Sequence, residues 1–412
     1  MSNRTFTSTQ TDVASAPTLV ALDAGNGGTL APPVDLAVAG APLAARNTVL
    51  PRVEAGPPPR LVVQPQERYQ PVRLLGEGGM GSVELVNDQD IGRQVARKRL
   101  HPELRSPGGV GRFVGEVRTI GRLEHPNIVP IHDVGQDVDG SYYFVMKYVE
   151  GDSLEQVIER LNRGDPETRR AWPFERRVEV VKAVLRALAA AHAQGIVHRD
   201  VKPANVMVGR FGEVFLTDWG IARSVGAPEE AAEEQVSSGR VGGSTRAGAL
   251  IGTFSCMSPE QLRGEHAKLD ARSDLYAVGL LLYELLTLRH PWRGEEDPAA
   301  IATIQREMKL AGSGAFQAHP HQSLPPVEYL YFCGDLCAYK VEDRVPSAMV
   351  ALQMIEALER GEVPVRCHVT FTKRMTRESA HWVERYPNTA FLAMILGGTA
   401  AVVGTGVLVG LL

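Results

Sequence analysis

The feature that most constrains this chain is a polar motif at residues 198–205, which reads His-Arg-Asp-Val-Lys-Pro-Ala-Asn. An Asp-Trp-Gly triplet, residues 218–220, begins thirteen residues after Asn205. The first motif places one carboxylate, Asp200, at fixed offsets from a lysine and an asparagine, where it can orient a hydroxyl group. The triplet adds a second carboxylate, Asp218, which can hold a cation. These groups are suited to metal-assisted phosphoryl transfer.

In the same order, the two motifs resemble the His-Arg-Asp catalytic loop and the Asp-Phe-Gly triplet of the bacterial, eukaryotic-like serine/threonine protein kinases. Val201 stands where the family has leucine, and Trp219 stands where it has phenylalanine. The larger ring of Trp219 would have to pack under the helix that carries Glu116. The alternative is a turn-rich polar loop in another fold, which the number of ordered matching positions disfavours.

The resemblance implies a role for each polar residue of the motifs. Asp200 would accept the proton of the substrate hydroxyl, and Lys202 would neutralise the transferring phosphate. Asn205 and Asp218 would hold Mg²⁺, with Mn²⁺ as an alternative. In this family a lysine two places after the catalytic aspartate marks serine/threonine kinases rather than tyrosine kinases. ATP is therefore the implied phosphoryl donor, and protein hydroxyls are the implied acceptors.

A glycine-rich segment at residues 75–83 has strand-like residues on both sides. Alone, its G-x-G-x-x-G pattern also fits a dinucleotide-binding turn. Such a turn would continue into a helix, whereas Val83, Leu85 and Val86 alternate into a second strand. We therefore predict a hairpin that covers nucleotide phosphates, because glycines let the backbone approach a ligand. Its predicted nucleotide-contacting residues are Gly76, Glu77, Gly78, Gly79, Gly81 and Val83.

The next strand, residues 95–98, matches the family's Val-Ala-Ile-Lys strand, with Arg97 at the usual apolar position. Because adjacent strand residues face opposite sides, we expect Arg97 to face solvent and Lys98 to face the nucleotide beside Ala96. The resemblance implies that Lys98 binds the α- and β-phosphates and pairs with Glu116. Considered alone, Lys98 would be an ordinary surface lysine.

Residues 147–151 resemble the hinge between the two lobes of a kinase, where backbone groups meet the adenine edge. Tyr148 and Val149 are the predicted hinge contacts. Met146 would lie at the back of the adenine pocket, and its position is equally compatible with a core methionine.

The second half of the predicted kinase domain contains helical patterns. Residues 176–194 carry apolar residues at helical spacing and lead into the catalytic loop. In the family, the aspartate that matches Asp274 anchors the catalytic-loop backbone, and the arginine that matches Arg344 pairs with Glu260. The helix after Arg344 is expected to bury Met349, Val350, Leu352, Ile355 and Leu358.

The segment from Asp218 to Glu260 spans 43 residues, which is long for the family, and ends in Ser-Pro-Glu rather than Ala-Pro-Glu. A solvated insertion is the simplest interpretation. Our hypothesis is that phosphorylation within it creates an anion that pairs with Arg199 and orders the loop. Thr253 is expected to meet Asp200 and Lys202 across the substrate groove. The candidate phosphosites are Ser237, Ser238, Ser244, Thr245 and Thr253.

Residues 1–66 are rich in Ala, Pro, Thr and Gly. Such a segment buries too little apolar surface to offset the entropy of ordering it, so we predict a disordered arm. Three prolines at residues 57–59 leave open a role as a ligand for a partner domain. No basic segment followed by an apolar core begins the chain, so no cleavable signal peptide is expected.

Charge and cysteine content limit the partners and the compartment. A formal net charge of −4 over 412 residues argues against general affinity for nucleic acids. Four irregularly spaced cysteines favour a reducing compartment over a disulfide framework. Cys333 and Cys337 are predicted to be buried thiols, with metal ligands as the disfavoured alternative.

Residues 361–388 are polar and mildly basic, whereas residues 389–412 carry no charge across 24 positions. At roughly 1.5 Å per residue, their apolar part can span a hydrocarbon layer of about 30 Å. Trp382 and Tyr386 lie where interfacial aromatic residues are common, and the basic flank predicts a cytoplasmic N-terminal side. We therefore predict a basic juxtamembrane linker and a single transmembrane helix, with a buried core helix as the alternative.

The predicted membrane segment contains a Gly-x-x-x-Gly motif at residues 406–410. This motif can bring two membrane helices close together. Homodimerisation through it, which would promote phosphorylation in trans, is a hypothesis. No external sensor domain is expected beyond the membrane segment.

These features together predict an α+β protein with the two-lobed protein-kinase fold at residues 67–360. A small, mainly antiparallel β lobe with one key helix would span residues 67–150, and a larger, mainly helical lobe would span residues 151–360. The predicted activity is ATP-dependent phosphorylation of protein serine and threonine, including the chain's own activation segment. Two other functions stay open. A membrane-tethered pseudokinase or scaffold is disfavoured because it would not need to retain the polar residues that are all present here, Lys98, Glu116, Asp200, Asn205 and Asp218. A small-molecule kinase is disfavoured by the long activation segment that ends in Ser-Pro-Glu.

Overall fold

The computed structural model of the chain describes residues 52–54, 60–62, 67–220, 223–224, 256–265, 269–292, 295, 297–310, 319–387 and 389. All of these residues belong to the second of the two units into which the chain divides, Pro42–Leu412. The predictions for the five candidate phosphosites and for the membrane segment lie outside the described residues. So does most of the predicted N-terminal arm.

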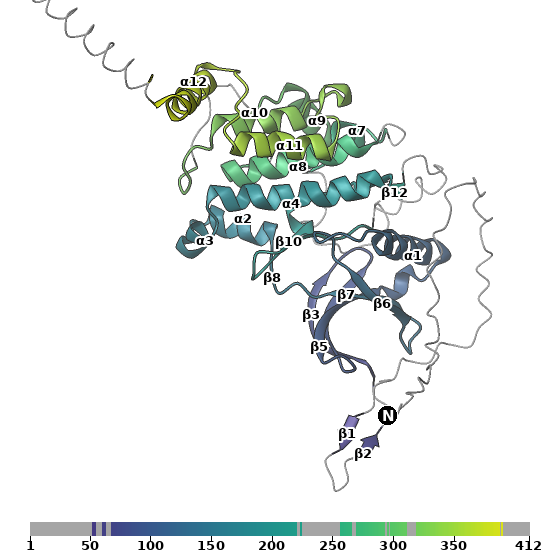
Figure 1. Cartoon of the computed structure of the whole chain (residues 1–412). Helices are drawn as coiled ribbons and strands as arrows, with labels where there is room; N and C mark the ends of the chain where they lie inside the picture. Colours follow the sequence, from purple (N-terminus) through teal and green to yellow (C-terminus); the bar gives the residue numbers. More distant parts are fainter. Residues whose placement is uncertain are drawn as a thin grey trace, which may run out of the picture. The chain divides into compact units, whose positions relative to one another are not determined.

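An antiparallel sheet of five strands forms the N-terminal lobe, in the order β3-β4-β5-β7-β6 (Figure 1). Helix α1 (Pro107–Arg122) lies between β5 and β6 in the sequence and is capped by Ser106, whose side chain accepts a hydrogen bond from the Gly109 amide. Phe113 of α1 packs against Phe144, with ring centroids 5.4 Å apart. The strands are β3 (Tyr69–Glu77), β4 (Gly81–Asp88), β5 (Arg93–Leu100), β6 (Ile131–Gln136) and β7 (Tyr142–Lys147).

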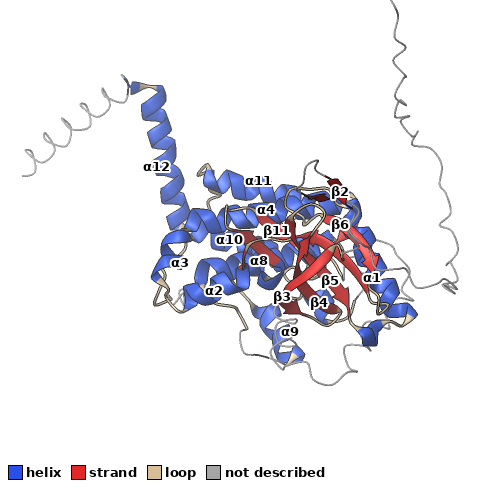
Figure 2. Cartoon of the chain, turned by 90° about the horizontal axis from the view of Figure 1, so that it is seen from below, coloured by secondary structure: helices blue, strands red, loops and turns tan. Residues whose placement is uncertain are grey.

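The C-terminal lobe is mainly helical, and its long helices pack around a shared apolar core (Figure 2). The helix predicted at residues 176–194 is α4 (Phe174–Ala193), and Val181, Val184 and Leu188 on it are fully buried, as predicted. The other helices are α2 (Leu154–Asn162), α3 (Pro166–Ala171), α7 (Pro259–Leu262), α8 (Ala271–Thr287), α9 (Pro298–Glu307), α10 (Val327–Leu336) and α11 (Ala348–Glu359).

Short strands and turns join the helices near the boundary between the lobes. Residues 148–150 connect β7 to β8 (Gly151–Ser153), which is where the hinge was predicted. Strand β10 (Val206–Gly209) pairs with β8 and with β11 (Val214–Leu216), so the catalytic-loop motif leads into a small sheet. The remaining short elements are η1 (Pro102–Leu104), β9 (Ile196–Val197), η2 (Pro203–Asn205), β12 (Arg223–Ser224) and η5 (Val341–Asp343).

Two predictions about side-chain exposure were wrong. Arg97 is buried, because its guanidinium binds Glu84 at 2.8 Å and Asp137 at 3.3 Å on the face of the sheet opposite Lys98. Met349 is 52% exposed, because Ala348, Leu352 and Ile355 occupy the buried face of α11 in its place.

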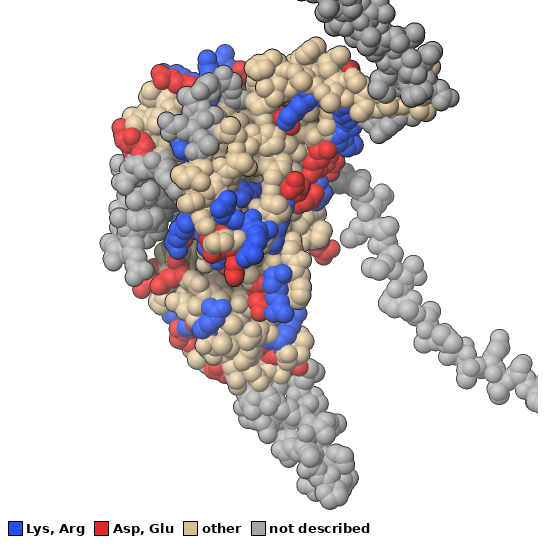
Figure 3. All heavy atoms as spheres, turned by 90° about the vertical axis from the view of Figure 1, so that its left-hand side faces the viewer, with Lys and Arg blue, Asp and Glu red and all other residues tan. Residues whose placement is uncertain are grey.

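Charged side chains of both signs lie among uncharged ones on one face of the molecule. On the face that lies at the left of Figure 1, Lys and Arg are interspersed with Asp and Glu (Figure 3). Exposed ion pairs of the C-terminal lobe include Arg160 with Asp152 at 2.5 Å and Arg163 with Glu159 at 3.3 Å. Exposed pairs of this kind contribute little to stability.

The structure departs from prediction at both ends of the kinase domain. Within the arm that was expected to be disordered, β1 (Arg52–Glu54) pairs with β2 (Arg60–Val62), and the three prolines fall between them. The predicted juxtamembrane linker contains a helix, α12 (His368–Arg385). Among the described residues, no helix is long and apolar enough to cross a membrane. The predicted membrane segment begins where the described residues end.

Candidate active site

Lys98 on β5 connects three elements of the structure. Its Nζ donates hydrogen bonds to Oε1 of Glu116 on α1 at 2.6 Å and to Oδ1 of Asp218 at 3.2 Å. The Glu116 side chain is 1% exposed and that of Lys98 is 12% exposed. Burial disfavours the charged ammonium, but the negative charges of Asp218 and Glu116 outweigh this effect and raise the pKa of Lys98. Lys98 is therefore cationic at neutral pH and can bind an anion.

Asp200 accepts hydrogen bonds from both of its predicted partners. Lys202 Nζ donates to Oδ2 of Asp200 at 2.8 Å, and Nδ2 of Asn205 donates to the same oxygen at 2.9 Å. Because both bonds use Oδ2, Oδ1 can accept a hydrogen bond from a substrate hydroxyl. Burial lowers the pKa of Lys202, but the charge of Asp200 and their hydrogen bond outweigh it and raise the pKa. A carboxylate and a cation are thus fixed side by side.

A buried carboxylate from α8 holds the backbone of this loop. Asp274 is 1% exposed. Its Oδ2 accepts a hydrogen bond from the backbone amide of His198 at 2.9 Å, and its Oδ1 accepts one from that of Arg199 at 2.7 Å. Nε2 of His192 lies 2.8 Å from Oδ2. These are the backbone contacts that the resemblance implied for Asp274.

Two residues of the site have left-handed backbone conformations. Arg199 has φ of 69° and Asp218 has φ of 60°. For residues other than glycine this conformation costs roughly 1–2 kcal/mol, so it persists where surrounding contacts hold it. Asp274 supplies such contacts for Arg199. Beside Asp218, the fully buried Trp219 packs edge-on against His198 with centroids 4.5 Å apart, which fixes the triplet against the catalytic loop.

Asn205 and Asp218, the predicted metal ligands, present suitable donor atoms. Nδ2 of Asn205 donates to the backbone oxygen of Asp200 at 2.8 Å, which turns the amide oxygen away from Asp200. Asp218 is 48% exposed and binds Lys98 through Oδ1. No group of three or more His, Cys, Asp or Glu arranged to hold a metal occurs among the described residues. This composition fits Mg²⁺, which takes one or two protein oxygens and completes its shell with water and substrate phosphates.

The glycine-rich segment forms the turn between β3 and β4, as predicted. The Gly78 amide donates to the carbonyl of Gly81 at 2.9 Å and closes the turn. A Cβ atom on Gly81 would lie 2.0 Å from the carbonyl oxygen of Arg99, so this position requires glycine. At Gly79, by contrast, a Cβ atom would meet nothing within 4 Å. Gly76 and Glu77 end β3 beside this turn.

The remaining predicted nucleotide contacts occupy neighbouring positions in the sheet. Val83 lies opposite Lys98 in the β4–β5 pairing, and Ala96 lies opposite Met146 in the β5–β7 pairing. Tyr148 and Val149 follow directly after β7 in the hinge. The register of the three strands thus places Val83 next to Lys98, and Met146 next to Ala96, two residues before Lys98 on the same strand.

The segment after the activation loop is fixed by a buried ion pair. Arg344 donates two hydrogen bonds to Glu260, each of 2.7 Å, and both side chains are excluded from solvent. Ser273 Oγ donates to Glu260 Oε1 at 2.7 Å. This pairing was predicted from the resemblance.

Two polar residues that position the site were missed in the sequence. Nε2 of Gln261 donates to the carbonyl of Arg199 at 2.8 Å, and Thr217 donates its amide and its hydroxyl to the carbonyl of Asn205 at 2.9 and 3.1 Å. The Ser-x-x-Gln spacing of a capping box marks Gln261, and this box forms at α7. No local signal marks Thr217.

The protein kinase domain family matches residues 69–355, which is more than half of the chain. A probable serine/threonine-protein kinase of Streptomyces coelicolor is 43% identical over 239 residues, covering 57% of this chain and 32% of that protein. Serine/threonine-protein kinase PksC of the same organism is 41% identical, covering 61% of this chain and 43% of PksC. The Mycobacterium leprae kinase PknB is 36% identical, covering 60% of this chain and 36% of PknB.

In each of these three relatives, the part that this chain matches is less than half of the protein. The antiparallel N-terminal lobe, the helical C-terminal lobe and the polar residues gathered around Lys98 and Asp200 agree with the family match. The chain belongs to the protein kinase domain family.

Proposed function

We propose that the chain is an ATP-dependent protein kinase that transfers the γ-phosphate of ATP to serine and threonine hydroxyls of proteins. The observation that carries the proposal is the pairing of Lys98 with both Glu116 and Asp218, next to Asp200 in its bonds with Lys202 and Asn205. Three relatives that match the chain are named as serine/threonine kinases. Phosphoryl transfer depends mainly on positioning and charge neutralisation, and these residues supply both.

In this mechanism each polar residue of the site contacts a particular group of ATP, of the substrate or of a neighbouring side chain. Lys98 binds the α- and β-phosphate oxygens, while Glu116 holds its ammonium in place. Asp200 orients the substrate hydroxyl through Oδ1 and accepts its proton, and Lys202 stabilises the charge that develops on the transferring phosphate. Asn205 and Asp218 would hold Mg²⁺, which neutralises the phosphate charge when bound.

The test is incorporation of labelled phosphate from ATP, with Mg²⁺, into a protein substrate such as myelin basic protein and into the chain itself. Asp200→Asn should lower the rate by about 10²–10⁴-fold, the usual contribution of a general base. The matched control is Asp152→Asn, which neutralises an aspartate that is paired with Arg160 on the surface. ATP binding without incorporation by the wild type would instead indicate a pseudokinase.

We further propose that the activation segment is autophosphorylated. The support is its hydroxyl-rich composition and the presence of Arg199 beside Asp200. Mass spectrometry after incubation with ATP should find phosphate on one or more of Ser237, Ser238, Ser244, Thr245 and Thr253. Wild-type activity in the variant with alanine at Ser237, Ser238, Ser244 and Thr245, with no phosphate in the wild-type segment, would reject this part.

We also propose that residues 389–412 anchor the chain in a membrane as a single span, with the kinase domain in the cytoplasm. Their 24 uncharged positions and the basic residues before them support this. The chain should resist alkaline carbonate extraction from membranes, and release would reject the anchor. We propose that the chain also dimerises through residues 406–410. The double variant Gly406→Leu, Gly410→Leu should then lose dimerisation, which fluorescence energy transfer between labelled chains in vesicles would measure.

A further inference from the structure

Helix α12 presents its apolar side chains away from the lobe on which it is docked. A helix that packs on a globular core normally buries its apolar face and exposes its polar face. In α12 the apolar Phe371 and Met375 are 52% and 47% exposed, and Val383 is 46% exposed. Phe371 and Met375 are four residues apart and therefore lie on one side of the helix.

The docked side of α12 is polar. Thr370, Lys373 and Arg377 follow one another at spacings of three and four residues, so they share a face. Thr370 is fully buried, and Lys373 binds both carboxylate oxygens of Glu328 on α10 at 2.8 Å. Just before the helix, Arg366 forms a bidentate pair with Asp335 of α10 at 2.7 Å. The N-terminal half of α12 is thus tethered by charge rather than by apolar packing.

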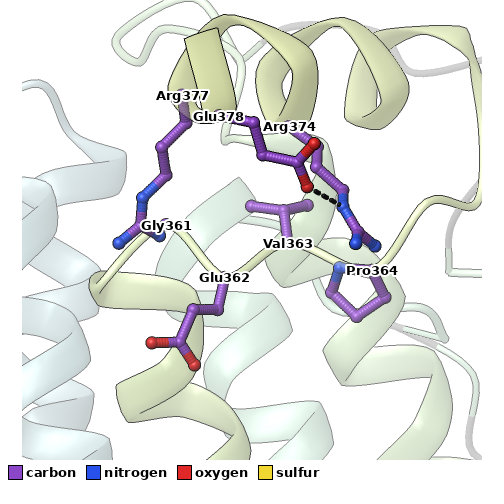
Figure 4. Close-up of a pocket in the computed structure, with 7 residues that line it drawn as sticks. All are labelled: Gly361, Glu362, Val363, Pro364, Arg374, Arg377 and Glu378. Carbon is purple, nitrogen blue, oxygen red and sulfur yellow. Dashed lines mark hydrogen bonds and ion pairs between the residues drawn. The ribbon is translucent and has the colours of Figure 1, made fainter. Parts of the chain in front are cut away.

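A cavity separates the next turns of α12 from the chain below them. It has a volume of about 560 Å³ and lies between residues 361–364 and the helix, where Arg374, Arg377 and Glu378 point toward it (Figure 4). The C-terminal half of the helix extends beyond α10 and α11 (Figure 2). The kinase core therefore does not account for the apolar stripe, and another surface must cover it to remove it from water.

The sequence around the helix identifies the covering surface. Three residues separate Arg385 from the 24 uncharged positions of residues 389–412. On α12 itself, four basic residues stand against two glutamates. A helix with an exposed apolar stripe binds in the plane of a bilayer, with the stripe among the acyl chains, and the net positive charge of the helix favours anionic lipid. A partner protein would not need to lie next to the predicted membrane segment.

We propose that α12 is an interfacial helix that lies on an anionic phospholipid surface through Phe371, Met375 and Val383. This proposal extends the membrane anchor proposed above. Because Lys373 and Arg366 pair with α10, the same helix would contact both the kinase lobe and the bilayer.

The test uses the full-length chain in vesicles of phosphatidylcholine and phosphatidylglycerol. A polarity-sensitive nitrobenzoxadiazole probe is attached at Met375→Cys in a Cys367→Ser background, since Cys256, Cys333 and Cys337 are buried. The matched control carries the probe at Met349→Cys on α11, a methionine of similar exposure, 52% against 47%.

The probe at position 375 should shift to shorter wavelength in vesicles and lose intensity when the vesicles contain doxyl-labelled lipid, whereas the probe at position 349 should show neither change. Equal behaviour of the two probes would overturn the proposal. A shift without doxyl quenching that disappears when the chain is diluted within the vesicles would show that a second copy covers the stripe, and would also overturn it. Alkaline carbonate extraction of the same vesicles tests the proposed membrane anchor separately.

Hydrogen exchange provides a second measurement that requires no label. Amides of residues 368–385 should exchange more slowly with vesicles present, and Phe371→Ser with Met375→Ser should abolish the slowing. The matched double variant is Phe211→Ser with Met349→Ser, which removes two apolar side chains that are 82% and 52% exposed elsewhere. It should keep the slowing, and an equal loss in both double variants would count against the proposal.

Discussion

Replacing Glu260 by glutamine removes one charge from an ion pair that water does not reach. Both side chains of the Glu260–Arg344 pair are 0% exposed, and they are joined by two bonds of 2.7 Å. Glutamine has nearly the same shape, so the substitution leaves the Arg344 charge without its counter-charge while the packing is preserved. Breaking a buried pair in this way typically costs about 3–5 kcal/mol.

The pKa of Glu260 gives an independent magnitude. Burial opposes its ionisation, but the hydrogen bonds and charge of Arg344 and the Ser273 hydroxyl lower the pKa from 4.5 to about 2. At 1.36 kcal/mol per unit, ionised Glu260 contributes roughly 3 kcal/mol at neutral pH. Because the folded-state pKa is the lower one, this stability is present above the unfolded-state pKa and is lost as the pH falls toward about 2. Roughly 1.4 kcal/mol should be lost by about pH 3.5.

Urea unfolding of the full-length chain in nonionic detergent, followed by tryptophan fluorescence, measures both quantities. Glu260→Gln should be about 3 kcal/mol less stable than the wild type at neutral pH, and this difference should shrink by about 1.4 kcal/mol near pH 3.5. The control is Glu362→Gln in the exposed pair with Arg360, whose stability should follow the wild type at each pH. A Glu260→Gln difference that stays constant with pH would refute the assigned pKa and its cause.

Three further substitutions test other contacts of the fold. Gly81→Ala should lower the free energy of unfolding by about 1–3 kcal/mol, because the added Cβ atom collides with the carbonyl oxygen of Arg99. Gly79→Ala should leave this free energy unchanged, because a Cβ atom there meets nothing within 4 Å. Asp274→Asn removes a buried charge that two backbone amides require, so kcat should fall by more than the Michaelis constant for ATP rises, as steady-state kinetics will measure. Arg97→Met should destabilise the chain by about 1–3 kcal/mol in urea, because Glu84 loses its buried partner.

Much of the active site can be predicted from the sequence because its residues have fixed offsets within single motifs. Asp200, Lys202 and Asn205 lie within six positions, and η2 turns the chain so that all three meet. Lys98 and Glu116 are farther apart, but each lies in a regular element whose face follows from its period. For these residues, sequence spacing largely determines where the side chain points.

The errors occurred where a second element decides exposure. Alternation along β5 correctly puts Arg97 on the face opposite Lys98, but it does not reveal that Glu84 of β4 and Asp137, just after β6, bind it on that face. On α11, the apolar pattern put Met349 on the buried side, whereas its neighbour Ala348 packs against the core and Met349 is exposed. In both cases the missing information was the neighbouring surface.

The residues that hold the catalytic loop in shape lie far from it in the sequence. Two distant residues hold Arg199 in its left-handed backbone conformation. Asp274 lies 75 positions later and accepts a hydrogen bond from the Arg199 amide, and Gln261 lies 62 positions later and donates one to the Arg199 carbonyl. Gln261 is next to Glu260, which Arg344 fixes from 84 positions away. The strained turn at the active site therefore depends on a chain of buried polar contacts within the C-terminal lobe. Loosening the Glu260–Arg344 pair should consequently reduce phosphoryl transfer as well as stability, although the side chains of both residues bind other partners than Asp200, Lys98 and Asn205 within the described residues.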